Sequence, residues 1–335
     1  MTLPALSTPS AASDNPPSTS TLRQLTGRID WRRGGLIAAL AVLVIVFTAL
    51  YPPYLSVQNG INVLLGASIT AIIAMGQSFV IATSGIDLSV GSVAALAGIV
   101  AGKAMNAGLP VSVSLLLALG AGMLAGLING AIVVFAGITP FMATLGTMSV
   151  FSGVALVLSN GRPLYDLPRA FTHPMSLRIA TIPLAVWVMI AIAVVLTVAL
   201  RNSTIGEYAL AIGGNEEATR LAGINISAYK LAVYTLSGTT AAIAGILITG
   251  RLGTADPTSG TDILLPAIAA AVMGGASLLG GEASVIGAVV GAIVITALQT
   301  GLTLLGVTVF VQIIAVGLVI IVAVAADRIA AKAGS

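Results

Sequence analysis

The chain contains no cysteine, and this absence excludes several kinds of chemistry at once. Disulfide bonds, thiolate nucleophiles and cysteine-ligated metals are all ruled out. The single histidine, His173, stands in a polar stretch where Asp166 is the only carboxylate nearby. That is too few ligands for a metal and too few partners for acid–base catalysis. We therefore expect neither a metal site nor a catalytic site.

Charge is the second scarcity. Only 7% of the 335 residues are charged, whereas ordinary soluble domains carry about 25%. Hydrophobic residues make up 57% of the chain, and its mean hydropathy is +1.08. Because so few charges cannot cover this apolar surface, lipid must be the solvent for most of it. The net charge of +3 does not indicate nucleic-acid binding, since no basic cluster lies on a soluble domain.

The chain also lacks the glycine-rich loop, ending in Lys-Ser or Lys-Thr, that cradles the phosphates of ATP. Its only lysines, Lys103, Lys230 and Lys332, stand in no such motif. We expect no ATP binding, no cofactor and no enzymatic activity in this chain. Any ATP and magnesium would be bound by a separate subunit.

Ten apolar runs approach the length that crosses the hydrocarbon core, about 17 to 25 residues. Because backbone groups in lipid must be hydrogen-bonded internally, these continuous runs predict helices. The expected fold is therefore an all-α polytopic membrane protein with about ten transmembrane helices. The runs cover residues 34–51, 63–83, 90–105, 111–135, 141–158, 182–200, 231–249, 263–279, 284–302 and 307–325.

Both ends of the chain are expected on the cytoplasmic side of the membrane. Residues 1–33 are rich in Ser, Thr, Pro and Ala and predict a disordered tail. Residues 34–326 form the transmembrane domain, and residues 327–335 form a C-terminal tail. Four arginines precede the first run, which places the N-terminus inside. A cleaved signal peptide is the alternative, but the run and the tail are too long for one.

Two connections between the runs are long. Residues 160–181 lie outside and residues 201–229 lie inside in this topology. A polar inner loop of this length, between membrane helices that are otherwise closely linked, indicates a contact with another protein, and a plain solvated loop is the alternative.

A short motif occurs twice. Thr-Ser-Gly-Ile-Asp-Leu at residues 83–88 recurs 175 residues later as Thr-Ser-Gly-Thr-Asp-Ile. One copy follows the second run and the other follows the seventh, so the copies face opposite sides. This indicates a five-plus-five inverted repeat, in which short segments at matching places point to the transport pathway. Asp87 and Asp262 are expected to cap the following helices, with contact to substrate hydroxyls as the alternative.

The first copy lies in a specific octapeptide, Gly-Ile-Asp-Leu-Ser-Val-Gly-Ser, at residues 85–92. With it, the chain resembles the ATP-binding-cassette (ABC) importer permeases of the ribose, xylose and arabinose group. The resemblance covers nearly everything from about residue 60 to the C-terminus. It continues through residues 126–130, 139–148, 160–163, 211–226, 274–281 and 299–306.

The resemblance implies a permease subunit that moves a small, ribose-like sugar across the inner membrane with ATP hydrolysed by another chain. It also implies three protein partners. These are a second permease, either identical or a close paralogue, a cytosolic ABC ATPase and a periplasmic sugar-binding protein. Membrane lipid surrounds the complex, and the stretch at residues 211–226 is expected to meet the ATPase.

The residue types in that stretch suit a docking helix. Gly213, Gly214 and Asn215 predict a turn followed by a helix start. Glu216 and Glu217 then occupy the first helical turn, and Arg220 lies on the same face, three and four residues on. A helix lying flat on the membrane is the alternative, but it would need a basic amphipathic face that is missing here.

Other functions stay open at this point. A secondary transporter driven by protons or sodium would place ionisable residues in mid-helix, whereas Lys103 is the only charged residue inside the ten runs. An ABC permease for a different small polar solute is a further alternative, as is a scaffold or channel. Many family members carry an acidic pair where residues 264–266 read Leu-Leu-Pro, so the sugar is not fixed.

Polar side chains within and beside the runs are candidates for the lining of the passage. Hydrogen bonding between helices is the alternative role for each of them. Aromatic residues make up only 4% of the chain, so little surface can stack on a sugar ring. We therefore expect weak binding by the permease itself, with selectivity set by the delivering protein. The candidates are Gln77, Asp87, Ser89, Asn129, Thr144, Asp262 and Gln299.

Overall fold

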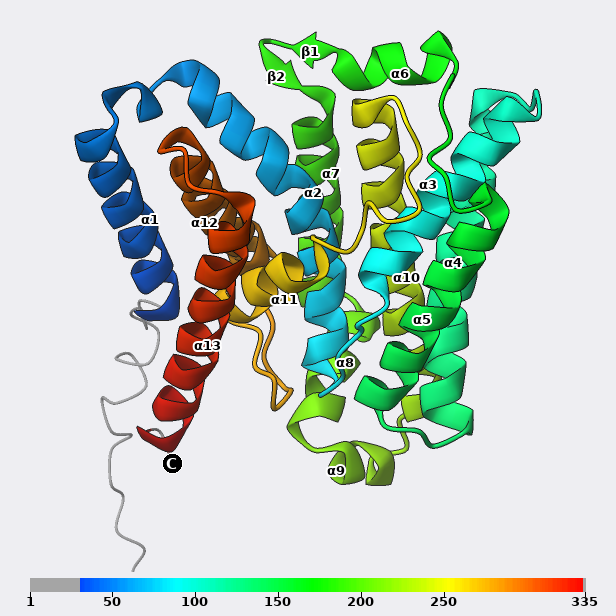
Figure 1. Ribbon diagram of the computed structural model, residues 1–335. Coiled ribbons are helices and arrows are strands. Elements are labelled where there is room, and N and C mark those ends of the chain that lie inside the picture. The colour runs from blue at the N-terminus through cyan, green and yellow to red at the C-terminus, as the bar shows by residue number, and fades with distance from the viewer. Residues whose placement is uncertain (1–30, 334–335) are drawn as a thin grey trace, which may run out of the picture.

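The computed structural model describes residues 31–333, and these residues are almost entirely helical (Figure 1). In chain order the elements are α1 (Trp31–Leu50), the 3₁₀ helix η1 (Pro52–Tyr54), α2 (Val57–Ala82), α3 (Val90–Asn106), α4 (Val111–Phe135), α5 (Pro140–Ser159), α6 (Arg169–Ser176), β1 (Arg178–Ile179), β2 (Ile182–Pro183), α7 (Leu184–Asn202), α8 (Thr204–Gly214), α9 (Glu216–Leu221), α10 (Ile226–Leu252), α11 (Leu264–Met273), α12 (Val285–Leu304) and α13 (Val309–Ala333).

Each of the ten expected spans corresponds to one apolar helix, so the all-α polytopic fold is confirmed. Six helices are long and apolar enough to cross a membrane: α2, α4, α5, α7, α10 and α12. The other four, α1, α3, α11 and α13, have shorter apolar stretches in the described residues. α11 ends at Met273, six residues before the expected end at Leu279. The helix stops because Gly275 takes a φ of +101°, a conformation that side-chain-bearing residues rarely adopt.

The ends of the chain differ slightly from expectation. The hypothesis of a disordered N-terminal tail falls on residues 1–30, which lie outside the described residues. α1 already begins at Trp31, and α13 continues to Ala333, so both helices extend past the predicted boundaries of the transmembrane domain. The start of α1 and the end of α13 lie on the same side of the molecule as α9 (Figure 1). This agrees with an even number of crossings.

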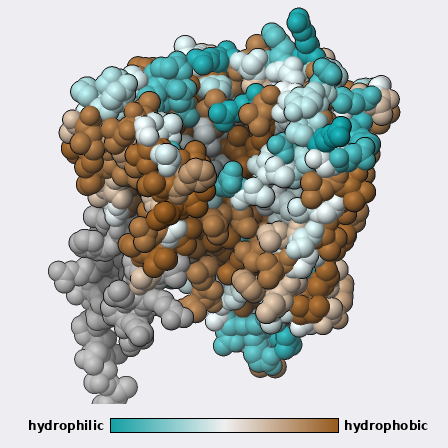
Figure 2. Space-filling model, in the orientation of Figure 1, coloured by the Kyte–Doolittle hydropathy of each residue, from teal (hydrophilic) through white to brown (hydrophobic). Residues whose placement is uncertain are grey.

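The surface of the molecule is divided into an apolar middle and two hydrophilic ends. Apolar residues cover most of the middle of the molecule, and hydrophilic residues gather at the two ends (Figure 2). We call these ends the α9 end and the α6 end. The long connection at residues 160–181 lies at the α6 end and is not a plain loop, because it contains α6 and β1. His173 therefore stands in a helix.

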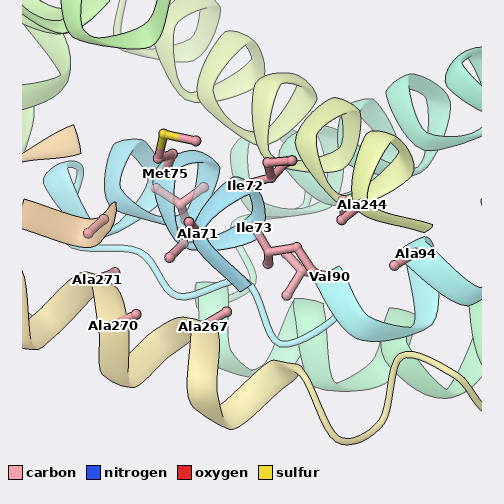
Figure 3. Close-up of a cluster of buried hydrophobic side chains, with 14 of the residues drawn as sticks. Ala71, Ile72, Ile73, Met75, Val90, Ala94, Ala244, Ala267, Ala270 and Ala271 are labelled. Atoms are coloured by element: carbon pink, nitrogen blue, oxygen red, sulfur yellow. The ribbon is translucent and has the colours of Figure 1, made fainter. Parts of the chain in front are cut away.

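The helices α2 and α10 form the centre. In α2, 83% of the most apolar window is buried, against 28% in α4, α5 and α7. α10 packs on α2, α3 and α4. Small side chains let these helices converge: in Figure 3, Ile72 and Ile73 of α2 lie among alanines of three other helices. The labelled alanines are Ala94 of α3, Ala244 of α10, and Ala267, Ala270 and Ala271 of α11.

The contact between α4 and α10 depends on glycine. A Cβ atom on Gly126 would overlap the carbonyl oxygen of Tyr234, and one on Gly238 would overlap that of Gly122. Without side chains at these points, the two backbones touch. Lipid tails are as apolar as the surfaces of the helices, so the hydrophobic effect does not drive helices together in a membrane. Close packing between small residues, as here, drives their association instead.

Two short helices start inside the molecule. α2 is followed by a short non-helical segment and then α3, and α10 is followed by a non-helical segment with several turns and then α11 (Figure 1). The two units run in opposite directions, as an inverted repeat predicts. They meet where a Cβ atom on Gly260 would overlap the backbone of Gly91. We call α3 and α11 the half-helices.

Replacing Gly126 by alanine is expected to destabilise the folded protein by about 1–3 kcal/mol, because the added methyl group must push α4 away from α10. The measurement is the temperature at which monodisperse protein is lost in detergent, followed by size-exclusion chromatography. Gly120→Ala in the same helix is the control. A Cβ atom at this position meets nothing within 4 Å, so we expect no loss of stability. Equal losses in the two variants would contradict the packing account.

Candidate functional site

The first candidate site is the α8–α9 pair at the α9 end. Asn215 separates the two helices and caps α9, since its side-chain oxygen accepts a hydrogen bond of 2.9 Å from the Ala218 amide. The helix start predicted at this residue is therefore confirmed. The turn predicted at Gly213 and Gly214 is wrong, because both residues belong to the last turn of α8. Gly213 is needed there for packing: a Cβ atom would overlap the carbonyl oxygen of Ala82.

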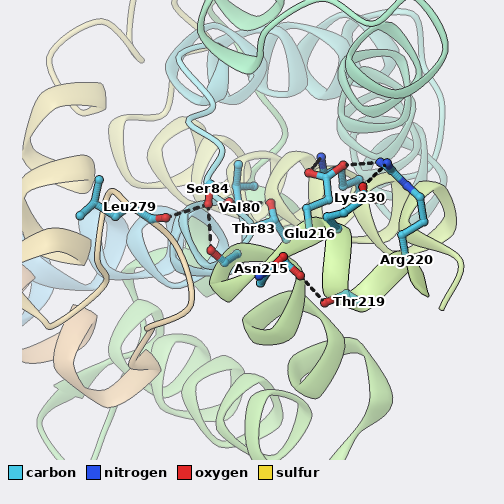
Figure 4. Close-up of polar contacts among 11 residues, drawn as sticks. Val80, Thr83, Ser84, Asn215, Glu216, Thr219, Arg220, Lys230 and Leu279 are labelled. Carbon is cyan, nitrogen blue, oxygen red and sulfur yellow. Dashed lines mark hydrogen bonds and ion pairs between the residues drawn. The ribbon is translucent and has the colours of Figure 1, made fainter. Parts of the chain in front are cut away.

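Charged side chains on α9 form a small chain of ion pairs (Figure 4). Arg220 binds Glu217 at 2.8 Å and Glu216 at 3.1 Å, and Lys230 of α10 binds Glu216 at 2.7 Å. Glu216 thus joins α9 to the start of α10. Exposed pairs of this kind contribute only about 0–1 kcal/mol each, so their main effect is to orient α9 rather than to stabilise the fold.

α9 also presents an apolar side chain to the outside. Leu221, the last residue of the helix, is 81% exposed among these charges. Beside it, a groove of about 430 Å³ lies between α9, the start of α10 and the end of α4. Its wall combines the charged groups of Glu216, Arg220 and Lys230 with the apolar Val133 and Val134. An exposed apolar residue ringed by polar groups, next to a groove, is typical of a protein-binding surface.

The second candidate site is a cleft of about 350 Å³ between α3, α5 and the segment that enters α11. Its polar lining consists of hydroxyl groups, and its remaining lining is apolar, with no charged residue. We call it the hydroxyl cleft. The hydroxyls belong to Ser92, Ser149, Ser152, Thr258 and Thr261.

A buried polar network lies behind this cleft and holds the start of α3. Asp87 is fully buried, and one of its carboxylate oxygens accepts hydrogen bonds from the Ser89 amide at 2.9 Å and the Ser89 hydroxyl at 2.6 Å. The other accepts a bond of 2.9 Å from the hydroxyl of Ser237 on α10. Asn129 of α4 donates to the Ser89 hydroxyl at 2.7 Å. Asp87 therefore satisfies a free amide at the helix start and ties α3 to α10.

α5 joins the same network. The Thr147 hydroxyl donates to the side-chain oxygen of Asn129 at 2.6 Å, and the Thr144 hydroxyl lies 3.0 Å from the carbonyl oxygen of Ile86. These contacts satisfy polar groups that lipid could not. The non-helical backbone between α2 and α3 can persist in the middle of the molecule because Asp87 and Thr144 bond to it, while residues of α4 and α10 bond to the side chains of the network.

The predicted passage residues separate into groups. Asp87, Ser89, Asn129 and Thr144 come together in the buried network and do not line the hydroxyl cleft. Gln77 is buried in α2, and its amide has no hydrogen-bond partner among the described residues. Asp262 is exposed beside Thr261 of the cleft, and the prediction that it caps α11 is wrong, because α11 begins at Leu264 after Ile263 without a side-chain cap. Gln299 lies on α12. Their role in transport stays a prediction.

The five hydroxyl residues of the cleft are not among the passage residues that the sequence predicted. Ser92 ends the specific octapeptide, and Thr258 and Thr261 lie in the second copy of the repeated motif, so these three carried a signal. Ser149 and Ser152, one helical turn apart in an apolar run, carried none. Among residues 31–333, no group of three His, Asp or Glu side chains could hold a metal ion.

Asn129→Ala is expected to destabilise the protein by about 1–3 kcal/mol, because it leaves the buried Thr147 hydroxyl with only a 3.3 Å contact to the Thr144 carbonyl oxygen and Ser89 without a donor. Asn129→Asp should destabilise further, since it places a second carboxylate beside Asp87. Thermal unfolding in detergent measures both effects. Asn202→Ala, at an exposed asparagine at the end of α7, is the control and should change stability by less than about 0.5 kcal/mol. A wild-type melting temperature for Asn129→Asp would contradict the network.

The comparisons with known proteins agree with this architecture. The model of a family described as the permease component of branched-chain amino acid transport systems matches residues 59–324. The ribose import permease of Haemophilus influenzae is 41% identical over 294 residues, which cover 87% of this chain and 91% of the relative. The ribose import permease of Bacillus subtilis is 38% identical over 296 residues, covering 88% of this chain and 92% of the relative.

A relative with another named sugar is nearly as similar. The D-allose transport system permease of Escherichia coli is 35% identical over 304 residues, which cover 90% of this chain and 93% of the relative. No solved structure matches the chain. Since the family model covers both half-helices, the hydroxyl cleft and α9, the protein is a member of this family of transport-system permeases, to which its resemblance at residues 85–92 already pointed.

Proposed function

We propose that the chain is the membrane-spanning permease subunit of an ABC importer, and that it moves a small sugar such as ribose across the bacterial inner membrane. A separate ATPase binds ATP and magnesium and supplies the energy, and a periplasmic sugar-binding protein delivers the cargo. Both termini lie in the cytoplasm, on the side of α9. The observation that carries the proposal is the hydroxyl cleft, in a chain whose relatives are named for ribose and allose.

The cleft suits a neutral polyol. Its volume of about 350 Å³ is at the lower end of the range for small-molecule sites. Each of the five hydroxyl oxygens can accept a hydrogen bond from a sugar hydroxyl, although Ser92, Thr258 and Thr261 donate their own protons within the protein, and the apolar lining can pack on the ring carbons. No aromatic side chain lines the cleft for stacking, so we expect weak binding that lets the sugar leave.

An amino acid is the other cargo that the family description suggests. Its ammonium and carboxylate groups would need charged partners or oriented helix ends when they leave water. The starts of α3 and α11 lie at the cleft and could face a carboxylate, but no acidic residue lines the cleft to pair with an ammonium group. This favours a sugar over an amino acid.

An ion-coupled transporter is also disfavoured, because no charged residue lines the cleft to couple an ion.

A second permease copy completes the passage. Thr258, Thr261 and Asp262 are exposed on a segment that reaches into the middle of the molecule, level with the apolar surface (Figures 1 and 2). Exposing such polar and charged groups to lipid hydrocarbon at this depth would be energetically unfavourable. We therefore infer that this face meets a second copy of the permease, identical or closely related, across a water-filled route.

α9 is the proposed contact with the ATPase. It is short, polar and exposed, and it lies at the end of the molecule that holds Arg201, Arg220 and Lys230. An excess of Lys and Arg marks the cytoplasmic side of membrane proteins. The exposed Leu221 would enter the partner, while Glu217 and Arg220 would border the contact.

Changing α9 is expected to uncouple the two subunits. In proteoliposomes with the ATPase and the binding protein, the variant Glu216→Gln, Glu217→Gln, Arg220→Gln should lose at least tenfold in both sugar uptake and stimulated ATP hydrolysis, because the contact loses its charges. Glu207→Gln on the neighbouring helix α8 is the control and should keep both rates. Unchanged coupling in the triple variant would count against docking at α9.

Blocking the hydroxyl cleft should stop uptake. Ser149→Phe is expected to lower the rate of sugar uptake at least tenfold, since the ring would occupy space that the sugar needs. Val150→Phe is the matched control, because Val150 is the next residue of α5, is 58% exposed and does not line the cleft. Uptake of radiolabelled ribose into the same proteoliposomes is the measurement. Equal uptake by the two variants would contradict a passage through this cleft.

A further inference from the structure

Three segments that are far apart in the sequence meet at the α9 end, and we call this contact the Ser84 junction. It consists of the end of α2 at residues 82–84, the end of α8 at Gly213, and the loop at residues 279–281. The Ser84 hydroxyl donates to the carbonyl oxygen of Leu279 at 2.8 Å and lies 3.3 Å from that of Gly213 (Figure 4). The Gly281 amide donates to the carbonyl oxygen of Ala82 at 3.0 Å.

The junction is packed backbone against backbone. A Cβ atom on Gly213 would overlap the carbonyl oxygen of Ala82, and one on Gly280 would overlap the Ser84 hydroxyl. Gly280 and Gly281 also take positive φ angles of +88° and +77°. With no side chain between them, the three segments cannot slide past one another without breaking the hydrogen bonds.

Ser84 itself has an unusual backbone. Its φ of +60° is a left-handed conformation that is unfavourable for a residue with a side chain. Glycine would fit this position better, and the side chain is exposed, so its hydroxyl is not needed to satisfy a buried group. Stability alone does not account for serine here, whereas the link to Leu279 and Gly213 does.

Each segment of the junction leads to a functional part. Gly213 lies two residues before Asn215, which caps α9. Ser84 begins the non-helical segment that contains Asp87 and continues into α3, where Ser92 lines the hydroxyl cleft. The loop at residues 279–281 follows α11, whose Leu264 lines the same cleft. The junction therefore joins α9 to both half-helices.

We propose that Ser84 is a positioning residue for transport, which passes a displacement of α9 to the half-helices at the hydroxyl cleft. The proposal rests on the function proposed above, since a partner must move α9. When it does, the end of α8 carries the end of α2 and the loop at residues 279–281 with it, through the Ser84 hydroxyl. The hydroxyl cleft then changes shape, because α3 and the segment that enters α11, which line it on two sides, move together. Without the hydroxyl, α9 moves and the half-helices follow incompletely.

The test compares Ser84→Gly with wild-type protein in proteoliposomes that contain the permease, the ATPase and the sugar-binding protein. Two rates are measured together, ribose taken up and ATP hydrolysed. We expect the amount of ribose taken up per ATP to fall at least fivefold. The melting temperature should not fall, because glycine relieves the left-handed backbone. A residue with only a structural role would show the opposite pattern, with lower stability and an unchanged ratio.

Thr83→Val is the matched control. It removes the adjacent hydroxyl, which bonds only to the carbonyl oxygen of Val80 in its own helix, at 2.8 Å, and should leave the ratio within twofold of wild type. A wild-type ratio in Ser84→Gly would overturn this inference and leave the proposed function standing. Absence of ATP-driven ribose uptake by the wild-type assembly would overturn the proposed function, and this inference with it.

Discussion

The structure depends on one constraint: backbone groups that face no water must find their hydrogen-bond partners inside the protein. Continuous helices meet it automatically, and broken ones do not. Between α2 and α3 the chain leaves helical geometry in the middle of the molecule, where the Asp87 carboxylate accepts from the Ser89 amide and the Thr144 hydroxyl donates to the Ile86 carbonyl oxygen. Asn129 and Ser237 complete the network by bonding to the side chains of Ser89 and Asp87. An acidic side chain can thus be fully buried in a chain with so few charges, and the start of α3 can border a cleft.

A second relation follows from the inverted arrangement of the two units. At the α9 end, the segment after α2 bonds to the end of α8 and to the loop after α11. At the α6 end, the segment after α10 bonds to the other long connection, through the paired amides and carbonyls of Ala255 and Leu164 at 2.8 and 3.0 Å. Each break in the helical pattern is therefore attached to a long connection on its own side. Such attachments would allow an event at either end to reach the middle, as alternating access requires.

The sequence predicted what depends on local rules. Run length gave the ten apolar helices, and the Asn215 cap and the repeated motif were recognisable as patterns. The sequence did not predict the features that depend on tertiary packing. α8 was missed because glycines at 206, 213 and 214 weaken a helix, and only the tertiary structure shows the close contacts that require glycine at 206 and 213. The lining of the cleft was missed because Asn129 and Ser149 are equally polar in sequence, and only tertiary structure buries the first and places the second at a cavity.

The central claim is that this permease has no motor of its own and is driven from the α9 end. The direct measurement is ribose accumulation in vesicles that contain the chain alone, with an imposed proton or sodium gradient, compared with vesicles that also contain an ABC ATPase, ATP and the binding protein. The account predicts accumulation only in the second preparation. Accumulation by the chain alone, driven by an ion gradient, would contradict it.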